Sequence, residues 1–318
     1  MAEMDYSLEG KKVYVAGSTG MVGSAILRKL AQEGCEAFGS TRQDVDLTRQ
    51  AEVEAWFDKT RPDAVFLAAA RVGGIMANRT RPATFLYENL MIEANIIEAA
   101  HQSGVEKLLF LGSSCIYPKA AKQPYTEDQL MQGPLEPTNE GYAIAKIAGI
   151  RMCEYYREQY GVNFISAMPT NLYGTGDNYD LETGHVLPAL VRRIHEAKLA
   201  GEDSITIWGT GSPMREFMHA DDCADALVFL MKRYKGAEHV NVGTEHEVSI
   251  YDLARMIAKL TGFEGEIRRD TSKPDGSPRK LMDSSRLHGL GWSSTISLKE
   301  GLARTVEEFR ALHAAGDL

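Results

Sequence analysis

The sequence predicts an α/β fold, a doubly wound parallel sheet followed by a smaller, mixed C-terminal region. Short apolar strands alternate with helices over residues 13–168, which is the pattern of parallel strands joined by crossover helices. The expected strand 63–70 is almost wholly apolar, as in a sheet covered on both faces. After Gly174 this regular alternation ends, and short helices, strands and loops follow. We therefore expect one domain built on the parallel sheet and one smaller domain of mixed structure.

The bulk properties exclude several classes of protein. The 318 residues are 44% hydrophobic and 25% charged, which is ordinary for a globular protein. A net charge of −9 argues against a general nucleic-acid binder, which needs a basic face. No N-terminal signal region and no apolar run of about 20 residues is present, so we expect no membrane association. The cysteines show neither a close pair nor metal-ligand spacing, which favours a reducing cytoplasm and no metal site: Cys35, Cys115, Cys153 and Cys223.

A glycine-rich turn joins the first strand to the first helix. Residues 13–16 form a short apolar strand, and the pattern G-x-x-G-x-x-G follows directly before an apolar helix that runs through Leu30. Such glycines permit a tight turn and let the backbone approach a pyrophosphate at the helix N-terminus. We expect a Rossmann-like dinucleotide site, although glycines that only pack a helix on a sheet are the alternative. The expected cofactor residues in this turn are Gly17, Gly20, Met21, Val22 and Gly23.

The end of the second expected strand, 35–39, bears on the choice of cofactor. Arg42 stands 19 residues past Gly23, where an NAD site usually offers a carboxylate, and the first acid, Asp44, comes later. A cation at this position favours the 2′-phosphate of NADP, although a solvated surface arginine is the alternative. Asp46 and Leu47 are placed to reach the adenine. A helix over 49–60 then leads to the strand 63–70, where the small side chain of Ala69 would let a cofactor lie close.

The chemistry is expected around residues 112–146. The strand 107–111 runs into Ser113 and Cys115, and a helix over 140–159 carries Tyr142 and Lys146, which lie four residues apart on one face. An ammonium there would lower the pKa of the Tyr142 phenol toward neutrality and make it a proton donor for a carbonyl. This spacing also occurs on many helices with no catalytic role. Residues 118–139 read as a loop over the site, and the helix 83–103 precedes the strand.

The C-terminal part is predicted less sharply. We expect a strand over 163–168, a helix over 187–200, a strand over 205–209 and a helix after residue 222 that returns to the first domain. The domain boundaries are then 8–174 with 213–242 for the cofactor domain, and 175–212 with 243–318 for the substrate domain. Residues 267–280 hold five cations and two anions, a local charge of +3. With Arg192, Arg193 and Arg215 these cations could hold a diphosphate, although an ordinary solvated loop is equally consistent.

The glycine turn, the serine and the Y-x-x-x-K motif together resemble the extended short-chain dehydrogenase/reductase superfamily. Five segments are similar to the GDP-L-fucose synthase family within it, and together they extend the resemblance over nearly the whole chain: 112–118, 136–146, 168–174, 213–217 and 273–280. One departure is Ser18-Thr19 in the glycine turn, where the family carries His-Arg. That departure leaves more of the contact with a 2′-phosphate to Arg42.

The resemblance implies a 3,5-epimerase and NADPH-dependent 4-reductase that acts on a GDP-sugar. It implies Cys115 as the base, His185 as the acid, Ser113 as a ligand of the C4 oxygen, and Tyr142 with Lys146 as the reducing pair. It adds Pro169, Asn171, Leu172 and His185, with Lys146, to the cofactor site. It also implies substrate contacts and a homodimer formed through helices 83–103 and 140–159. The implied substrate-binding residues are Asn171, Arg193, Trp208, Arg215 and Asp275.

Two alternatives stay open from the residues. A nucleotide-sugar dehydratase or 4-epimerase would keep the fold and recycle NAD in place. Dehydratases of the superfamily put an Asp-Glu pair beside the catalytic hydroxyl, where this chain has Ser114-Cys115, and a 4-epimerase needs no Cys/His pair. A non-catalytic NADP-sensing protein would tend to lose Tyr142 or Lys146, and both are present.

Overall fold

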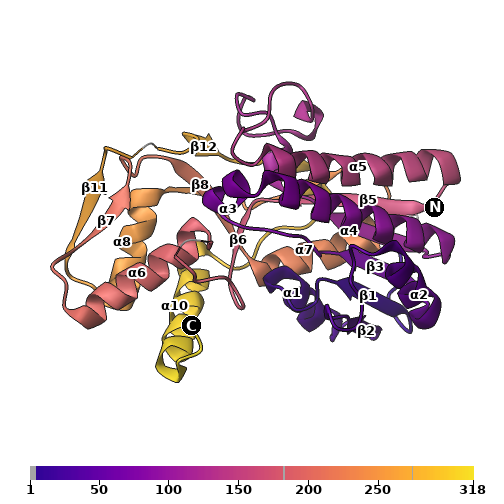
Figure 1. Cartoon of the computed structure of the whole chain (residues 1–318), viewed down its shortest axis with the longest axis horizontal. Coiled ribbons are helices and arrows are strands. Elements are labelled where there is room, and N and C mark those ends of the chain that lie inside the picture. The colour runs from indigo at the N-terminus through magenta and orange to yellow at the C-terminus, as the bar shows by residue number, and fades with distance from the viewer. Residues whose placement is uncertain (1–4, 182, 274) are drawn as a thin grey trace.

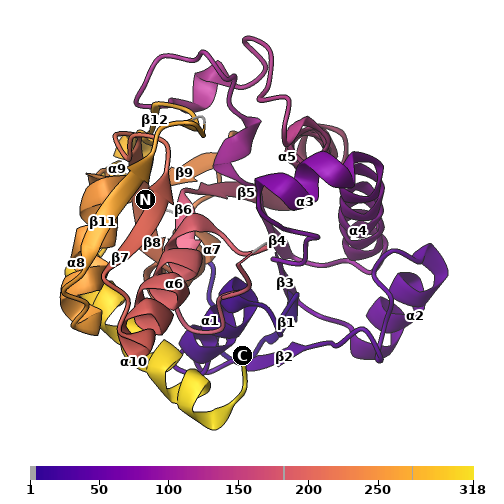
Figure 2. The ribbon, with the colours of Figure 1, turned by 60° about the vertical axis from the view of Figure 1, so that its left-hand side comes forward.

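The computed structural model describes residues 5–181, 183–273 and 275–318 of the chain. Its centre is a six-stranded, all-parallel sheet in the order β2-β1-β3-β4-β5-β9 (Figures 1 and 2). This confirms the predicted doubly wound fold, because each parallel neighbour is reached by a crossover. The strands are β1 (Lys12–Ala16), β2 (Glu36–Gly39), β3 (Ala64–Leu67), β4 (Lys107–Leu111), β5 (Asn163–Pro169) and β9 (Val240–Val242).

Helices cover both faces of this sheet. Alternate residues of a strand point to opposite faces, so Val13 and Val15 of β1 pack in one apolar core and Tyr14 and Ala16 in another. The first core includes α1 (Met21–Leu30) and α7 (Ala220–Arg233). The second includes α2 (Gln50–Thr60), α4 (Pro82–Gln102) and α5 (Glu140–Tyr160), and α4 packs along α5 (Figure 1).

A second, smaller set of elements builds a third core beside the sheet (Figure 2). Strand β8 pairs with β6, β10 and β12, while β7 and β11 form a separate two-stranded ribbon. The strands are β6 (Asn171–Tyr173), β7 (Ser204–Trp208), β8 (Met214–His219), β10 (Glu247–Ser249), β11 (Glu266–Asp270) and β12 (Arg279–Lys280). The helices of this set are α6 (Val186–Ala200), α8 (Ile250–Thr261) and α10 (Leu298–Ala315). The short helix α9 (Ser285–Gly289) packs against β9 instead, and its Leu287 belongs to the first core.

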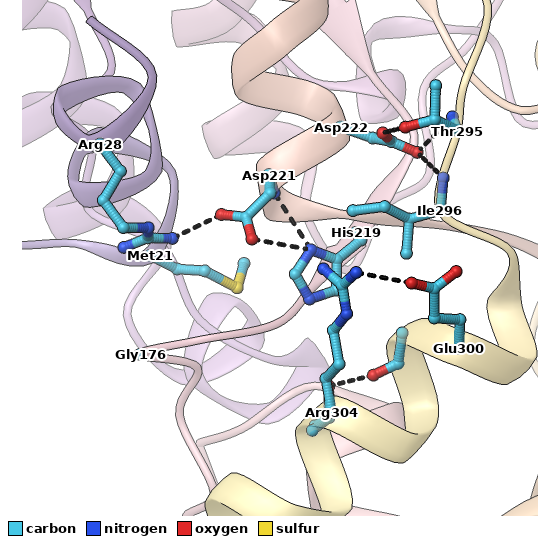
Figure 3. A network of polar contacts seen from close by, with 12 residues as sticks. Met21, Arg28, Gly176, His219, Asp221, Asp222, Thr295, Ile296, Glu300 and Arg304 are labelled. Atoms are coloured by element: carbon cyan, nitrogen blue, oxygen red, sulfur yellow. Dashed lines mark hydrogen bonds and ion pairs between the residues drawn. The ribbon is translucent and has the colours of Figure 1, made fainter. Parts of the chain in front are cut away.

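A polar network joins the helix after the glycine turn to these later elements (Figure 3). Arg28 on α1 pairs with Asp221 at 2.6 Å, and the backbone N–H of Asp221 donates to the ring of buried His219 at 3.2 Å. The next carboxylate, Asp222, accepts from the backbone N–H of Thr295, just before α10, at 3.0 Å. The start of α7 therefore fixes α1 and the C-terminal segment in one arrangement.

The elements differ from the sequence predictions at a few points. Strand β3 ends at Leu67 rather than residue 70, because the chain then turns along the edge of a cavity. A short helix α3 (Ile75–Thr80) follows Gly74 and was not predicted. The loop 118–139 contains a single 3-10 turn, η2 (Glu127–Gln129), and it lies against the segment around β12 (Figure 2).

Candidate active site

A cavity of about 560 Å³ opens at the carboxyl ends of the parallel strands, which is where doubly wound sheets bind ligands. Every residue that we expected at the cofactor lines it, and so do Ser113 and Tyr142. These cofactor residues come from the glycine turn, the ends of β2 and β3, helix α5 and the segment after β5: Gly17, Gly20, Met21, Val22, Gly23, Arg42, Asp46, Leu47, Ala69, Lys146, Pro169, Asn171, Leu172 and His185. Their individual roles stay predictions.

Close backbone approach explains two of the glycines. Gly17 has φ +86°, and a Cβ there would lie 2.7 Å from the Cα of Ala69. A Cβ on Gly23 would lie 2.0 Å from the carbonyl oxygen of Gly17. Any side chain at either position would push α1 away from the strands, so the turn holds the start of α1 against the cavity.

At the β2 end of the cavity, Arg42 is the cation best placed for a 2′-phosphate. Its side chain is 72% exposed and lies 3.9 Å from the carboxylate of Asp46. The Asp44 carboxylate is already engaged in two hydrogen bonds, since it accepts from the Thr41 hydroxyl at 2.7 Å and from the Thr41 N–H at 2.8 Å. A second cation of the cavity lining, Arg71, is paired with a carboxylate on α4 at 3.4 Å. Among the described residues, Arg42 therefore offers the least engaged positive charge at this end.

Lys146 lines the cavity floor and is almost completely buried. Its ammonium donates to the carbonyl oxygen of Leu111 at 3.0 Å and lies 2.9 Å from a carboxylate oxygen of Glu93 on α4. It also lies 5.8 Å from the centre of the Tyr142 ring. Sequence reasoning missed Glu93. The signal was available, because Glu93 falls on the apolar face of its helix, with Ile97 one turn further on.

The structure contradicts our expectation for the pKa of Tyr142. Burial raises this pKa well above its usual value, and the neighbouring Cys115 and Glu93 raise it further, while Ser113 acts in the opposite direction. The sequence predicted a lowered pKa because it placed an ammonium four residues along the same helix. Burial of the phenol, which is the largest cause of the raised pKa, was not considered, and neither was the carboxylate of Glu93 at that ammonium.

Cys115 lies in the 3-10 turn η1 (Ser114–Ile116), directly after β4, and its backbone N–H donates to the Ser113 hydroxyl at 3.4 Å. It is half-buried and does not line the main cavity, but it neighbours Tyr142. Burial raises the pKa of the Cys115 thiol, while Ser113, Lys280 and Lys146 lower it. Sequence reasoning missed Lys280 as an individual residue, because it appeared only as one charge of a basic loop.

Two hydrogen bonds fix the position of Lys280. The amide of Gln123, in the loop 118–139, donates to the carbonyl oxygen of Arg279 at 2.5 Å and accepts from the N–H of Leu281 at 2.8 Å. The backbone on both sides of Lys280 is thus held by the loop that begins just after Cys115. The loop therefore brings an ammonium from the C-terminal part of the chain to the thiol.

His185 caps the start of α6 and lines the cavity together with Ser113 and Tyr142. Burial lowers the pKa of its imidazole. A neutral imidazole gives up a proton less readily than an imidazolium, so an acid role for His185 depends on a protonated fraction that falls as the pH rises.

The expected substrate residues lie beside the cavity on the smaller set of elements, and of these only Asn171 lines it. The side-chain amide of Asn171 donates to the carbonyl oxygen of Glu216 at 2.8 Å. The Arg193 guanidinium donates to the backbone of β7 at 3.0 Å, and Asp275 accepts from Thr210 just after that strand at 2.9 Å. Trp208, at the end of β7, is 63% exposed.

Arg215 joins this group from β8. A Cβ on Gly276, next to Asp275, would lie 3.1 Å from the Arg215 guanidinium. These contacts gather the expected substrate residues around the end of β7, beside the start of β12. Pro274, within one of the motifs, lies outside the described residues.

Several cations of the basic loop already have partners. Arg268 pairs with Glu266 at 2.9 Å and Arg279 with Glu247 at 2.7 Å. Arg192 pairs with a glutamate on its own helix at 2.8 Å. The predicted diphosphate contact is therefore better supported for Arg193 and Arg215, whose guanidinium groups donate to backbone carbonyl oxygens.

Among the described residues, no group of three or more His, Cys, Asp or Glu is arranged to hold a metal ion. No helix within the described ranges has the length and apolarity needed to span a membrane.

Comparison with known proteins gives the family. Residues 13–243 match the NAD dependent epimerase/dehydratase family. The GDP-L-fucose synthase of Sinorhizobium fredii is 59% identical over 96% of this chain and 97% of its own length. The GDP-L-fucose synthase of Escherichia coli is 53% identical over 94% of this chain and 96% of its own length.

A solved structure shows the same arrangement. The GDP-L-fucose synthetase of Naegleria fowleri bound to NADP superposes with a TM-score of 0.89 at 28% identity, and the match covers 98% of both chains. The agreement in sequence extends over both sets of elements described above, and so does the agreement in fold. The chain therefore belongs to the NAD dependent epimerase/dehydratase family and, within it, to the GDP-L-fucose synthases.

Proposed function

We propose that the protein converts GDP-4-keto-6-deoxy-D-mannose to GDP-L-fucose by epimerisation at C3 and C5 followed by NADPH-dependent reduction at C4. The observation that carries this proposal is the placement of Ser113, Tyr142 and Lys146 at one cavity, with Cys115 beside Tyr142. The identity to GDP-L-fucose synthases over nearly the whole chain supports the same substrate.

The epimerisation needs a base, an acid and a group that stabilises the enolate. The C4 ketone acidifies the hydrogens at C3 and C5, so each can be removed from one face and returned on the other. Cys115 as thiolate removes the proton, and His185 returns it. The Ser113 and Tyr142 hydroxyls hydrogen-bond the C4 oxygen and stabilise the negative charge that develops there.

The reduction uses the same polar groups at C4. Bound NADPH supplies the hydride. Tyr142 donates a proton to the C4 oxygen, and Lys146 orients the nicotinamide ribose. The glycine turn holds the pyrophosphate against the start of α1, and Arg42 contacts the 2′-phosphate.

The smaller set of elements then acts as the GDP-sugar domain. Arg193 and Arg215 contact the diphosphate, Trp208 packs on an apolar face of the ligand, and Asn171 and Asp275 complete the contacts. The division of the chain into a cofactor domain (8–174 with 213–242) and a substrate domain (175–212 with 243–318) is part of this proposal.

Purified protein is mixed with GDP-4-keto-6-deoxy-D-mannose and NADPH, and the absorbance of NADPH is followed while the product sugar is identified by NMR. We expect oxidation of NADPH and GDP-L-fucose as the product. Protein that binds NADPH but neither oxidises it nor changes the sugar would contradict the proposal. Such a result would favour the dehydratase or 4-epimerase alternative.

We also infer a homodimer formed through α4 and α5. Large apolar or aromatic side chains are exposed on these two adjacent helices, which favours a partner surface there: Tyr87, Ile144, Tyr155 and Tyr160. The cysteines within the described ranges are all free thiols, which supports a reducing, cytoplasmic location. Sedimentation equilibrium of wild type and Tyr155→Glu tests the interface. We expect a dimer that the charge weakens, and a wild-type monomer would contradict the inference.

A further inference from the structure

A buried ion pair lies directly beneath the cavity floor. The Lys146 ammonium and a carboxylate oxygen of Glu93 are 2.9 Å apart, and their side chains are 2% and 1% exposed. Lys146 belongs to α5 and Glu93 to α4, so the pair crosses between the two helices. Burial of a charge is costly unless an opposite charge compensates it. Burial raises the pKa of the Glu93 carboxyl, and the ammonium of Lys146 opposes that rise.

The packing around Glu93 makes room for the carboxylate. Gly149, three residues beyond Lys146 on α5, faces it: an added Cβ would lie 2.9 Å from the second carboxylate oxygen and 2.4 Å from the ring of Phe110. The ammonium itself lies 4.8 Å from the centre of that ring. A glycine, a phenyl ring and the end of β4 thus form a close-fitting compartment around one lysine and one glutamate.

Tyr142 meets charged or titratable groups from three elements. Lys146 approaches from α5, Glu93 from α4 and Cys115 from η1, with Lys280 of β12 beyond the thiol. A lone ammonium would favour the phenolate, and a carboxylate favours the phenol. With Glu93 at 2.9 Å from the ammonium, the pair carries no net charge. On its other side Glu93 lies near the Cys153 thiol. Burial raises the pKa of that thiol to about 12, and the charge of Glu93 also raises it.

We propose that Glu93 is a positioning residue of the reductase: it holds the Lys146 ammonium in place and neutralises it, so that Tyr142 remains a protonated phenol. This inference rests on the proposed reduction at C4. Reduction of a ketone consumes a proton at the oxygen, so the tyrosine must start protonated. An enzyme that oxidises an alcohol at the same place needs the phenolate instead. The buried carboxylate favours the first of these two states and adds to the larger effect of burial of the phenol itself.

The test is a titration of Tyr142 that requires no substrate. Protein labelled with ¹³Cζ-tyrosine is titrated by NMR, and the Tyr142 resonance is assigned by its absence in Tyr142→Phe. In the wild type we expect Tyr142 to stay protonated beyond the ordinary tyrosine pKa of about 10. In Glu93→Gln we expect the midpoint to fall by about one pH unit or more, because the ammonium is no longer compensated.

Two further variants separate charge from packing. Glu93→Asp keeps the charge and should keep a midpoint close to that of the wild type. Glu98→Gln removes a different carboxylate of α4, one that accepts from the Tyr156 hydroxyl, and should leave Tyr142 unchanged. An unchanged midpoint in folded Glu93→Gln would overturn the proposal.

The wild type alone also decides the question if Glu93→Gln does not fold. A Tyr142 midpoint more than about one unit below the ordinary tyrosine pKa would overturn the proposal without any variant at Glu93. The titration reports only the ionisation of the Tyr142 phenol and needs no substrate. An unchanged midpoint in Glu93→Gln would therefore contradict the role of Glu93 alone. Failure of the proposed function would appear separately, as absent NADPH oxidation in the wild type.

Discussion

Two lysines lie near the reacting groups, and they differ in what surrounds them. Lys146 is fully buried and has the Glu93 carboxylate at 2.9 Å. Lys280 is half-buried near Cys115 and, within the described part of the chain, has no carboxylate within 4.0 Å. Lys146 has an ion-pair partner that balances its charge, whereas Lys280 has none among the described residues, although Glu136 also raises its pKa against the larger effect of burial. Both lysines lower the pKa of Cys115.

The difference matches the two half-reactions that we propose. A base must be deprotonated, and the proposed base Cys115 has near it an ammonium without an ion-pair partner, which lowers the pKa of the thiol against the larger effect of burial. A proton donor must be protonated, so Tyr142 benefits from a lysine whose charge is balanced. The two groups at one site thus have lysines in different electrostatic settings, although burial still holds the pKa of both Cys115 and Tyr142 above its usual value.

The largest expected effect separates the two reacting groups. Tyr142→Phe should lower NADPH oxidation by about 10²–10⁴-fold, the usual range for loss of a general acid, while exchange of C3 and C5 hydrogens with solvent persists. Cys115→Ser should abolish that exchange and leave NADP binding unchanged. Deuterium incorporation by mass spectrometry, without NADPH, reports the exchange. Equal loss of exchange in both variants would show that the division of roles is wrong.

Next in size is the effect of filling the compartment around Glu93. Gly149→Ala places a methyl group against Phe110 and the carboxylate, and overpacking of this kind costs about 1–3 kcal/mol of unfolding free energy. Urea denaturation measures this loss. The matched control is Gly104→Ala, where an added Cβ meets nothing within 4 Å, although its φ of +77° adds a strain of its own. If Gly149→Ala were as stable as the wild type, the compartment would be looser than described.

A smaller effect is expected from the uncompensated lysine. Lys280→Gln removes a charge that lowers the pKa of Cys115, so that pKa should rise. Exchange at C3 and C5 needs the thiolate, and it should fall about tenfold near neutral pH, with its acidic limb moved to higher pH. Arg279→Gln is the matched control, because that neighbouring cation is paired with Glu247. Similar losses in both variants would point to the fold of β12 instead of the charge.

The smallest effect is expected from an exposed cation. Arg42→Ala should raise the KM for NADPH by about fivefold, and by less at high salt, because screening weakens charges that face water. The KM for NADH should hardly change. Steady-state kinetics with both cofactors at two ionic strengths checks this. An unchanged NADPH to NADH preference would mean that Arg42 does not contact the 2′-phosphate.

Much of the fold was predictable because local patterns determine it. The strand 107–111 was predicted with the bounds that the structure gives, since it is short, apolar and followed by glycine. The position of the expected cofactor residues at the cavity was predictable for a related reason: in a parallel sheet, the ends of all strands meet at one edge. Helix α3 was not predicted because it is one short segment after two glycines, with no apolar repeat long enough to detect.

The electrostatics of the site were not predictable in the same way. Glu93 lies 53 residues before Lys146, and Lys280 lies 165 residues after Cys115, as their numbering shows. No local pattern links residues so distant, and only the packing of α4 on α5 and of β12 on the loop 118–139 brings them together. A pKa depends on every charge nearby. It also depends on burial, which is the largest cause of the raised pKa of Tyr142, so the expected shift was wrong in direction although both Tyr142 and Lys146 were identified from the sequence.

The most direct test of this account is a pair of pH profiles measured on the same proteins. Solvent exchange at C3 and C5 and oxidation of NADPH are followed across pH in the wild type, Lys280→Gln and Glu93→Gln. We predict that Lys280→Gln moves the acidic limb of exchange to higher pH, and that Glu93→Gln moves the alkaline limb of reduction to lower pH. If the acidic limb of exchange stayed in place in Lys280→Gln, or the alkaline limb of reduction stayed in place in Glu93→Gln, the account would be contradicted.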